Sequence, residues 1–195
     1  MKLHLLSSVA RSPFKPFLLM VLLAISLVGG VARPSTAAGQ RATDRTQTSP
    51  GLLITEIMYN PSGGQEYEFI ELKNLGAASF PLGGVAFVAG IAFTFPTGAG
   101  LAPGAFAVLV QDPAAFTARY PGIPIAGVYS GRLDNAGERV TLSDPTGATL
   151  IELTYDDAPP WPTSADGLGY SLVNADAAGD PNLASTWRAS TLPNG

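Results

Sequence analysis

The chain has 195 residues, no cysteine, a single histidine (His4) and a formal net charge of −4. Disulfide bonds are therefore impossible, and the rest of the chain cannot form a Ser-His-Asp triad, a Cys-His dyad or a zinc shell of thiolates and imidazoles. An acidic surface repels phosphate backbones, so nucleic acid is not an expected partner.

Residues 1–38 are predicted to be a secretory signal peptide. Lys2, Arg11 and Lys15 precede an apolar run at 17–32, and the small residues "STAA" follow it. As a helix this run would reach roughly 24 Å, short of the hydrocarbon core of about 30 Å, so we favour cleavage over an uncleaved membrane anchor. Cleavage would remove four of the eleven Lys and Arg residues and none of the fifteen acids, which leaves a formal net charge of −8.

Residues 39–50 lack apolar periodicity and are predicted to be a flexible linker. A single domain is expected over 51–190, followed by a short tail at 191–195. Within the domain, short apolar runs separated by Gly and Pro predict strands at 52–59, 67–74, 84–90, 91–96, 105–111, 138–144, 148–156 and 168–174. Many short strands at this spacing favour an all-β sandwich or barrel.

One segment, "DPAAFTARYPG" (112–122), predicts a short helix instead. Asp112 can cap the helix, a proline follows at the first helical position, and Pro121 stops it. Phe116 and Tyr120 are four residues apart, so we expect both rings to pack onto the sandwich.

The most regular pattern is a hairpin formed by "ERVTLSD" (138–144) and "ATLIELTYD" (148–156). Apolar and polar residues alternate in both runs, which aims one row of each strand at a common core. Between them, "DPTG" (144–147) has the proline and glycine positions of a type I turn.

Several pieces in this order resemble a bacterial lamin tail domain: "ITEIMYNP", "EFIELKN", "GERVTLSDPTG", and "WP" before "DGLGYSL". The resemblance runs from about Leu52 to Trp187 and implies an immunoglobulin-like β-sandwich without an active site. Lamin tail domains are interaction modules, which in bacteria are appended to exported or cell-surface proteins, sometimes beside nucleases or other hydrolases. The chromatin binding of nuclear lamins is not expected here, because the chain is acidic and is predicted to be exported. Members of the family commonly end in a Gly/Pro-rich tail, so the resemblance raises the hypothesis that the tail at 191–195 ends a truncated gene product.

Three acids in "QEYEFIELK" are candidates for acid–base chemistry. On a strand, Glu66 and Glu68 would share one face and Glu71 the other, so they would not form a cluster. We expect solvent-facing acids beside a turn, and the resemblance suggests a structural hydrogen bond for Glu71.

Asp156, Asp157 and Asp166 are candidate oxygen ligands for Ca²⁺, and "NADAAGDPN" (174–182) offers a similar set. Neither spacing fits an EF-hand loop. Asp and Asn also make turns through their own side chains, and this is the interpretation we favour for both stretches.

Trp161 and Trp187 could present a sugar- or peptide-stacking surface, with Trp161 the candidate binding residue. We favour burial in the core for both.

The sequence thus favours an exported, non-catalytic module without a cofactor, which binds a protein or a cell-envelope component, for example through an exposed sheet edge. It would meet a membrane only through an uncleaved signal segment. One alternative is a Ca²⁺- or carbohydrate-dependent adhesion domain that uses Trp161 with Asp156, Asp157 and Asp166. Another is a hydrolase with paired carboxylates, or the accessory domain of a larger secreted hydrolase or nuclease.

Overall fold

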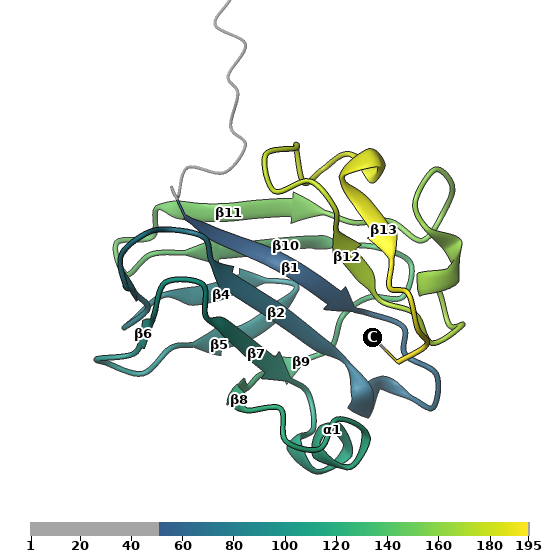
Figure 1. Cartoon of the computed structure of the whole chain (residues 1–195), viewed down its shortest axis with the longest axis horizontal. Helices are drawn as coiled ribbons and strands as arrows, with labels where there is room; N and C mark the ends of the chain where they lie inside the picture. Colours follow the sequence, from purple (N-terminus) through teal and green to yellow (C-terminus); the bar gives the residue numbers. More distant parts are fainter. Residues whose placement is uncertain (1–50, 195) are drawn as a thin grey trace, which may run out of the picture. The chain divides into compact units, whose positions relative to one another are not determined.

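Two β-sheets packed face to face form the body of the protein (Figure 1). The structure is a computed structural model that describes residues 51–194. These residues form one compact unit. The predicted signal peptide and the whole predicted linker lie outside the described residues. Among the helices of residues 51–194, none combines the length and the hydrophobicity needed to cross a bilayer.

The first sheet has six strands in the order β13-β12-β1-β2-β7-β8. In chain order these are β1 (Leu52–Met58), β2 (Phe69–Asn74), β7 (Phe106–Val110), β8 (Ile125–Val128), β12 (Leu172–Asn174) and β13 (Trp187–Ala189). Neighbouring strands are antiparallel except for β7 and β8, which run parallel.

The second sheet has five strands in the order β11-β10-β4-β5-β9. These are β4 (Ala86–Ala89), β5 (Ile91–Thr94), β9 (Ser130–Gly131), β10 (Arg139–Ser143) and β11 (Thr149–Thr154), and a separate pair is formed by β3 (Phe80–Pro81) and β6 (Gly100–Leu101). Only Tyr129 separates β8 from β9, so the chain passes from one sheet to the other there and closes one side of the sandwich.

This architecture confirms the predicted all-β sandwich with one short helix, and a strand lies within each of the eight predicted ranges. The prediction missed β3, β6, β8, β9 and β13, together with the 3₁₀ turns η1 (Gln65–Tyr67), η2 (Thr163–Ala165) and η3 (Ala184–Thr186). The missed strands have two to four residues, which is too short for an alternating pattern to stand out from its surroundings.

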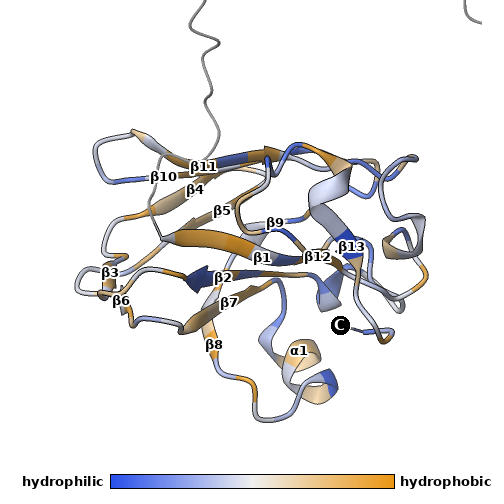
Figure 2. Ribbon diagram, turned by 45° about the horizontal axis from the view of Figure 1, so that its top comes forward, coloured by the Kyte–Doolittle hydropathy of each residue, from blue (hydrophilic) through white to orange (hydrophobic). Residues whose placement is uncertain are grey.

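The core fills the space between the two sheets. Hydrophobic residues predominate along β4, β5 and β7 (Figure 2), and the inward rows of both sheets are fully buried. In the predicted hairpin, Val140 and Leu142 of β10 and Ile151 and Leu153 of β11 all lie in this core, which confirms the expected alternation. The amide of Gly147 donates to the carbonyl of Asp144, as the expected turn requires.

Helix α1 (Pro113–Arg119) lies on the outer face of the six-stranded sheet (Figure 1). Oδ1 of Asp112 accepts hydrogen bonds from the amides of Ala114 (2.8 Å) and Ala115 (2.9 Å), which confirms the predicted cap. Phe116 is buried edge-on against Phe69 of β2, with ring centroids 5.6 Å apart. These two rings belong to a second, smaller apolar cluster, which fastens the helix to the sheet.

A β-bulge interrupts β1 at Thr55. Ile54 pairs with Leu72, and Glu56 pairs with the adjacent residue of β2, Glu71. Thr55 is therefore an extra residue in β1. A bulge changes which face the following side chains occupy. As a result Ile57 returns to the core, while Glu56 lies on the outer face of the sheet beside Glu71.

Candidate functional site

The candidate calcium ligands take part in turns and loop contacts. Oδ1 of Asp156 accepts from the amide of Ala158 (2.8 Å), as in an Asx turn. Oδ1 of Asp166 accepts from the side-chain amide of Asn60 (2.6 Å). Asp157 follows Asp156 in the same half-exposed loop. Within the described part of the chain, no three acidic or histidine side chains are placed so that they could hold a metal ion.

The second predicted acidic stretch also forms turns. Oδ1 of Asp176 accepts from the amide of Ala178 (3.1 Å), and Oδ1 of Asp180 accepts from the amide of Asn182 (2.9 Å). Both contacts are the local side-chain-to-backbone bonds that Asp makes in turns.

The two tryptophans pack together, with ring centroids 6.4 Å apart. Trp187 is buried, as expected, and its indole N–H donates to the carbonyl of Pro181 (2.8 Å). Trp161 is half-buried and packs against the main core. The expected burial in the core is therefore confirmed for Trp187 and holds only in part for Trp161.

The expectation that Glu68 faces solvent was wrong, because this side chain is only 1% exposed. Glu68 has the same parity as Ile70 and Leu72 of β2, so it points into the sandwich, whereas Glu71 points outward as predicted. Its Oε2 accepts from the amide of Leu133 (2.8 Å) and from the hydroxyl of Tyr129 (3.2 Å). These two bonds tie the crossover between the sheets to the start of β2.

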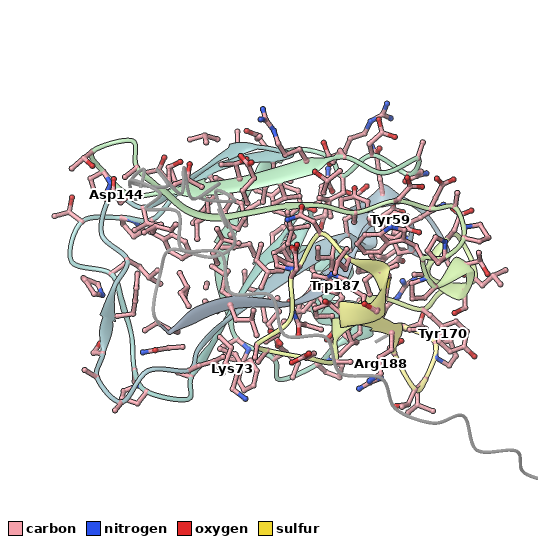
Figure 3. The ribbon with its side chains drawn as sticks, turned by 90° about the horizontal axis from the view of Figure 1, so that it is seen from above. Tyr59, Lys73, Asp144, Tyr170, Trp187 and Arg188 are labelled. Atoms are coloured by element: carbon pink, nitrogen blue, oxygen red, sulfur yellow. The ribbon has the colours of Figure 1, made fainter. Side chains whose placement is uncertain are left out.

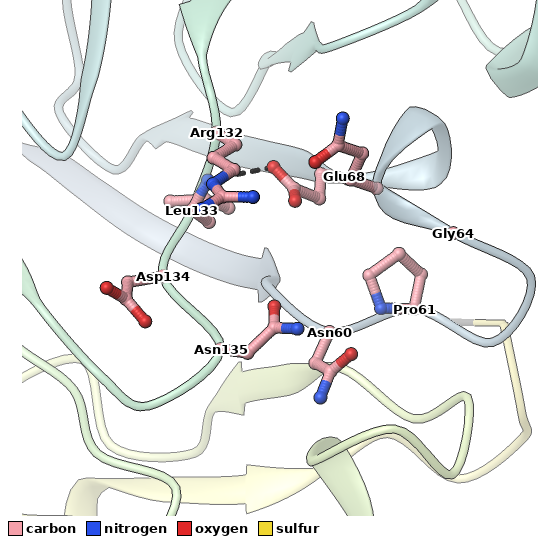
Figure 4. Close-up of a pocket in the computed structure, with 9 residues that line it drawn as sticks. Asn60, Pro61, Gly64, Glu68, Arg132, Leu133, Asp134 and Asn135 are labelled. Carbon is pink, nitrogen blue, oxygen red and sulfur yellow. Dashed lines mark hydrogen bonds between the residues drawn. The ribbon is translucent and has the colours of Figure 1, made fainter.

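A pocket of about 280 Å³ opens beside Glu68 (Figure 4). Its walls come from the loop after β1 and from the segment after β9, and they consist of Asn60, Pro61, Gly64, Gln65, Glu68, Arg132, Leu133, Asp134 and Asn135. The Glu68 carboxylate points toward Arg132 and Leu133 (Figure 4). Burial raises the pKa of Glu68 to about 7, although its two hydrogen bonds and the Arg132 charge lower it. This carboxyl therefore exchanges its proton near neutral pH.

A second pocket, of about 240 Å³, lies on the outer face of the six-stranded sheet, next to α1. We call it the helix groove. It is lined by Glu56 of β1, Phe69 and Glu71 of β2, Val108 of β7, and Phe116, Tyr120 and Ile123 of the helical segment. The wall toward α1 is apolar, and the side toward β1 carries the two carboxylates.

Each carboxylate of the helix groove is oriented by a hydroxyl group. Thr55, at the bulge, donates to Oε1 of Glu71 (2.6 Å), which confirms the structural hydrogen bond suggested for Glu71. Ser171 donates to Oε1 of Glu56. Burial raises the pKa of both carboxyls, and the charge of Glu71 raises that of Glu56 further.

Neither Glu56 nor the helix groove was predicted from the sequence. Strict alternation from Ile54 would have pointed Glu56 into the core, and only the bulge places it outside. The apolar spacing of β1, with core residues at 52, 54, 57 and 59, carries this signal, since it departs from a period of two between 54 and 57.

The model of the family described as "Lamin Tail Domain" matches residues 45–157, which is more than half of the chain. A search of the curated proteins found no match. Strands β12 and β13 follow the matched region, yet β12 pairs with β1 and completes the same sandwich. With the immunoglobulin-like β-sandwich described above, this match shows that the chain belongs to the lamin tail domain family.

Proposed function

We propose that this domain is a non-catalytic binding module of an exported protein, and that it contacts a protein or cell-envelope partner through the helix groove. The observation that carries the proposal is an apolar pocket that opens on a sheet face. Ile123 at its wall is 49% exposed, and Phe106 and Val128 nearby on β7 and β8 are also exposed. Exposed apolar surface that surrounds a pocket is typical of interaction sites.

The sheet edges offer less to a partner than this face. The outer strands of the six-stranded sheet, β13 and β8, have three and four residues, and short edge strands pair poorly with other chains. On the edge strand β11, the amide of Thr154 already donates to Oδ1 of Asn182 (2.9 Å). We therefore place the partner on the face and not at an edge.

Two surface variants test this location. Ile123→Glu places a charge in the helix groove, and Val88→Glu is its matched control, since Val88 is 62% exposed on β4 of the other sheet. We expect a partner captured from envelope extract, then purified, to bind the exported protein and its Val88→Glu variant equally and the Ile123→Glu variant at least about tenfold more weakly. Equal binding by all three proteins would refute the groove as the contact site.

Export is tested separately. Cell fractionation and N-terminal sequencing of the mature protein should find it outside the cytoplasm and without residues 1–38. A cytoplasmic protein that retains Met1 would contradict this part of the proposal.

A further inference from the structure

The helix groove combines two features that together specify a ligand chemistry: an apolar wall and a pair of facing carboxylates. A transverse row crosses the sheet, because Glu56 pairs with both Val173 and Glu71, Glu71 with Val108, and Val108 with Ile125. Two acids thus occupy adjacent positions in this row, whose other members are aliphatic except at its end on β13, where Arg188 pairs with Val173. Like charges directly opposite each other destabilise a sheet, so a cation bound beside this pair would stabilise it.

The chain's own nearby cations make other contacts, although the charge of Arg188 lowers the pKa of Glu56 and the charge of Lys73 lowers that of Glu71. The ammonium of Lys73 lies over the ring of Phe106, 4.5 Å from its centroid. The guanidinium of Arg119 stacks on Tyr67 at 3.3 Å and donates to the carbonyl of Ser62 (2.8 Å). Arg188 donates to the carbonyl of Ala189 (2.9 Å). Figure 3 shows Lys73 and Arg188 on the same side of the molecule.

Neither carboxylate of the groove forms an ion pair. Within residues 51–194, the one ion pair joins Arg139 to Glu152 on the other sheet, at 3.8 Å. The groove therefore presents two acidic side chains that feel the charges of Arg188 and Lys73 but form no ion pair with a cation of the described residues.

The wall toward α1 supplies a third acceptor. The hydroxyl of Tyr120 is buried, and the Arg119 side chain is a hydrogen-bonding neighbour that lowers its pKa; no other partner for this hydroxyl is present in the part of the chain that the structure describes. Burial raises the pKa of Tyr120, while the Arg119 charge lowers it and the Glu56 charge raises it again, so the hydroxyl stays protonated and lies within the field of Glu56. An alkylammonium group has three donors and no acceptor. The groove offers three acceptor side chains for these three donors: Glu56, Glu71 and Tyr120.

We propose that the helix groove binds a lysine side chain of the partner protein, with its ammonium between Glu56, Glu71 and the Tyr120 hydroxyl and its methylene stem against Phe69 and Phe116. A lysine stem packs on apolar surface while its charged end seeks acceptors, which is the division of the groove. The rings of Phe69 and Tyr120 meet edge to face at 5.7 Å and form the apolar wall. This inference rests on the proposed function, since it names the group that the groove recognises.

Two peptides test it on the full-length protein. The probe Ac-Gly-Leu-Lys-Leu-Gly-NH₂ is compared with the same peptide carrying norleucine, which keeps the stem and removes the ammonium. We expect the lysine peptide to shift the backbone amide resonances of Glu56, Glu71 and Tyr120 in ¹⁵N-labelled protein, and to bind about tenfold or more tightly than the norleucine peptide.

Charge-neutral variants supply the control. Glu56→Gln with Glu71→Gln should abolish the preference for lysine, whereas Glu152→Gln, on the other sheet, should preserve it. Equal binding of the two peptides, tighter binding of an arginine peptide, or a lysine preference that survives the double substitution would each overturn the inference. The test of the proposed function is distinct, because loss of partner binding in Ile123→Glu would support the groove even if both peptides bound equally.

Discussion

Glu56 and Glu71 lie directly opposite each other across β1 and β2, on the outer face of the six-stranded sheet. The bulge at Thr55 creates this pair and also supplies one of the hydroxyls that hold it, since Thr55 donates to Glu71. The arrangement lowers stability in the free protein, because two acids repel each other and both are partly withdrawn from water. Such a cost at a surface pocket is characteristic of binding sites.

Removal of one charge from this pair should stabilise the domain. We expect Glu71→Gln to raise the free energy of unfolding at about pH 8 by about 0.2–1 kcal/mol, because it removes the repulsion with Glu56. In a double-mutant cycle, Glu56→Gln should add less in the Glu71→Gln background than in the wild type. Urea denaturation measures both effects, and strictly additive changes would show that the two acids do not interact.

Glu68 should make stability depend on pH. Its folded pKa is about 7, raised from 4.5, so the fold favours the protonated form. The stabilising contribution is complete below pH 4.5 and is lost as pH rises through 7. Between about pH 4 and about pH 8, the wild type should lose about 3 kcal/mol more than Glu68→Gln. Urea titrations across this range give the comparison.

Glu66→Gln is the matched control for this experiment, because Glu66 lies two residues earlier in η1, which has no buried residue. Its stability profile should follow that of the wild type. If Glu68→Gln also follows the wild type, the buried carboxyl does not have the raised pKa described above.

The cap of α1 should be worth about 1 kcal/mol. Asp112→Ala removes the acceptor for the amides of Ala114 and Ala115, which should lower the free energy of unfolding by about 0.5–2 kcal/mol. Asp112→Asn keeps an acceptor and should cost much less. A loss of equal size in both variants would assign the effect to the charge and not to the cap.

Alanine substitutions at two turn glycines distinguish the cost of backbone strain from that of a steric clash. Gly137 and Gly147 have φ values of +92° and +87°, where a side chain is unfavourable. A Cβ at Gly137 would lie 2.6 Å from the carbonyl oxygen of Tyr155, whereas a Cβ at Gly147 would meet nothing within 4 Å. We expect Gly147→Ala to cost about 1–2 kcal/mol and Gly137→Ala clearly more, as measured by thermal unfolding. Equal losses would contradict the close approach at Gly137.

The proposed binding mode leads to a prediction on salt. Dissolved ions screen the contact between a bound lysine and two half-buried carboxylates only in part. They also weaken the attraction of the acidic surface for an approaching lysine. The affinity of the lysine peptide should therefore fall as NaCl is raised, and that of the norleucine peptide should not. Calorimetric titration at low and high salt compares the two, and a parallel response would argue against a charged contact.

Local patterns in the sequence predicted much of the fold. The alternation of β10 and β11, the turn at Asp144 and the cap at Asp112 each depend on residues close together in the chain, and all three are present. Contacts between distant segments were harder to predict. Glu68 was expected to face solvent. The groups that donate to its buried carboxyl, the hydroxyl of Tyr129 and the amide of Leu133, lie more than sixty residues further along the chain, so no local pattern indicates them.

The sequence by itself determined the all-β class, the position of the helix and the lack of cysteine and histidine chemistry in the domain, because composition and periodicity act locally. Only the tertiary structure decided which acidic side chains line the helix groove. The bulge turns Glu56 outward beside Glu71, and the packing of α1 on the sheet adds Tyr120 and the apolar wall. A surface pocket forms where separate elements meet. The residues that line it can therefore be named only when the register of the strands and the position of the helix on the sheet are known.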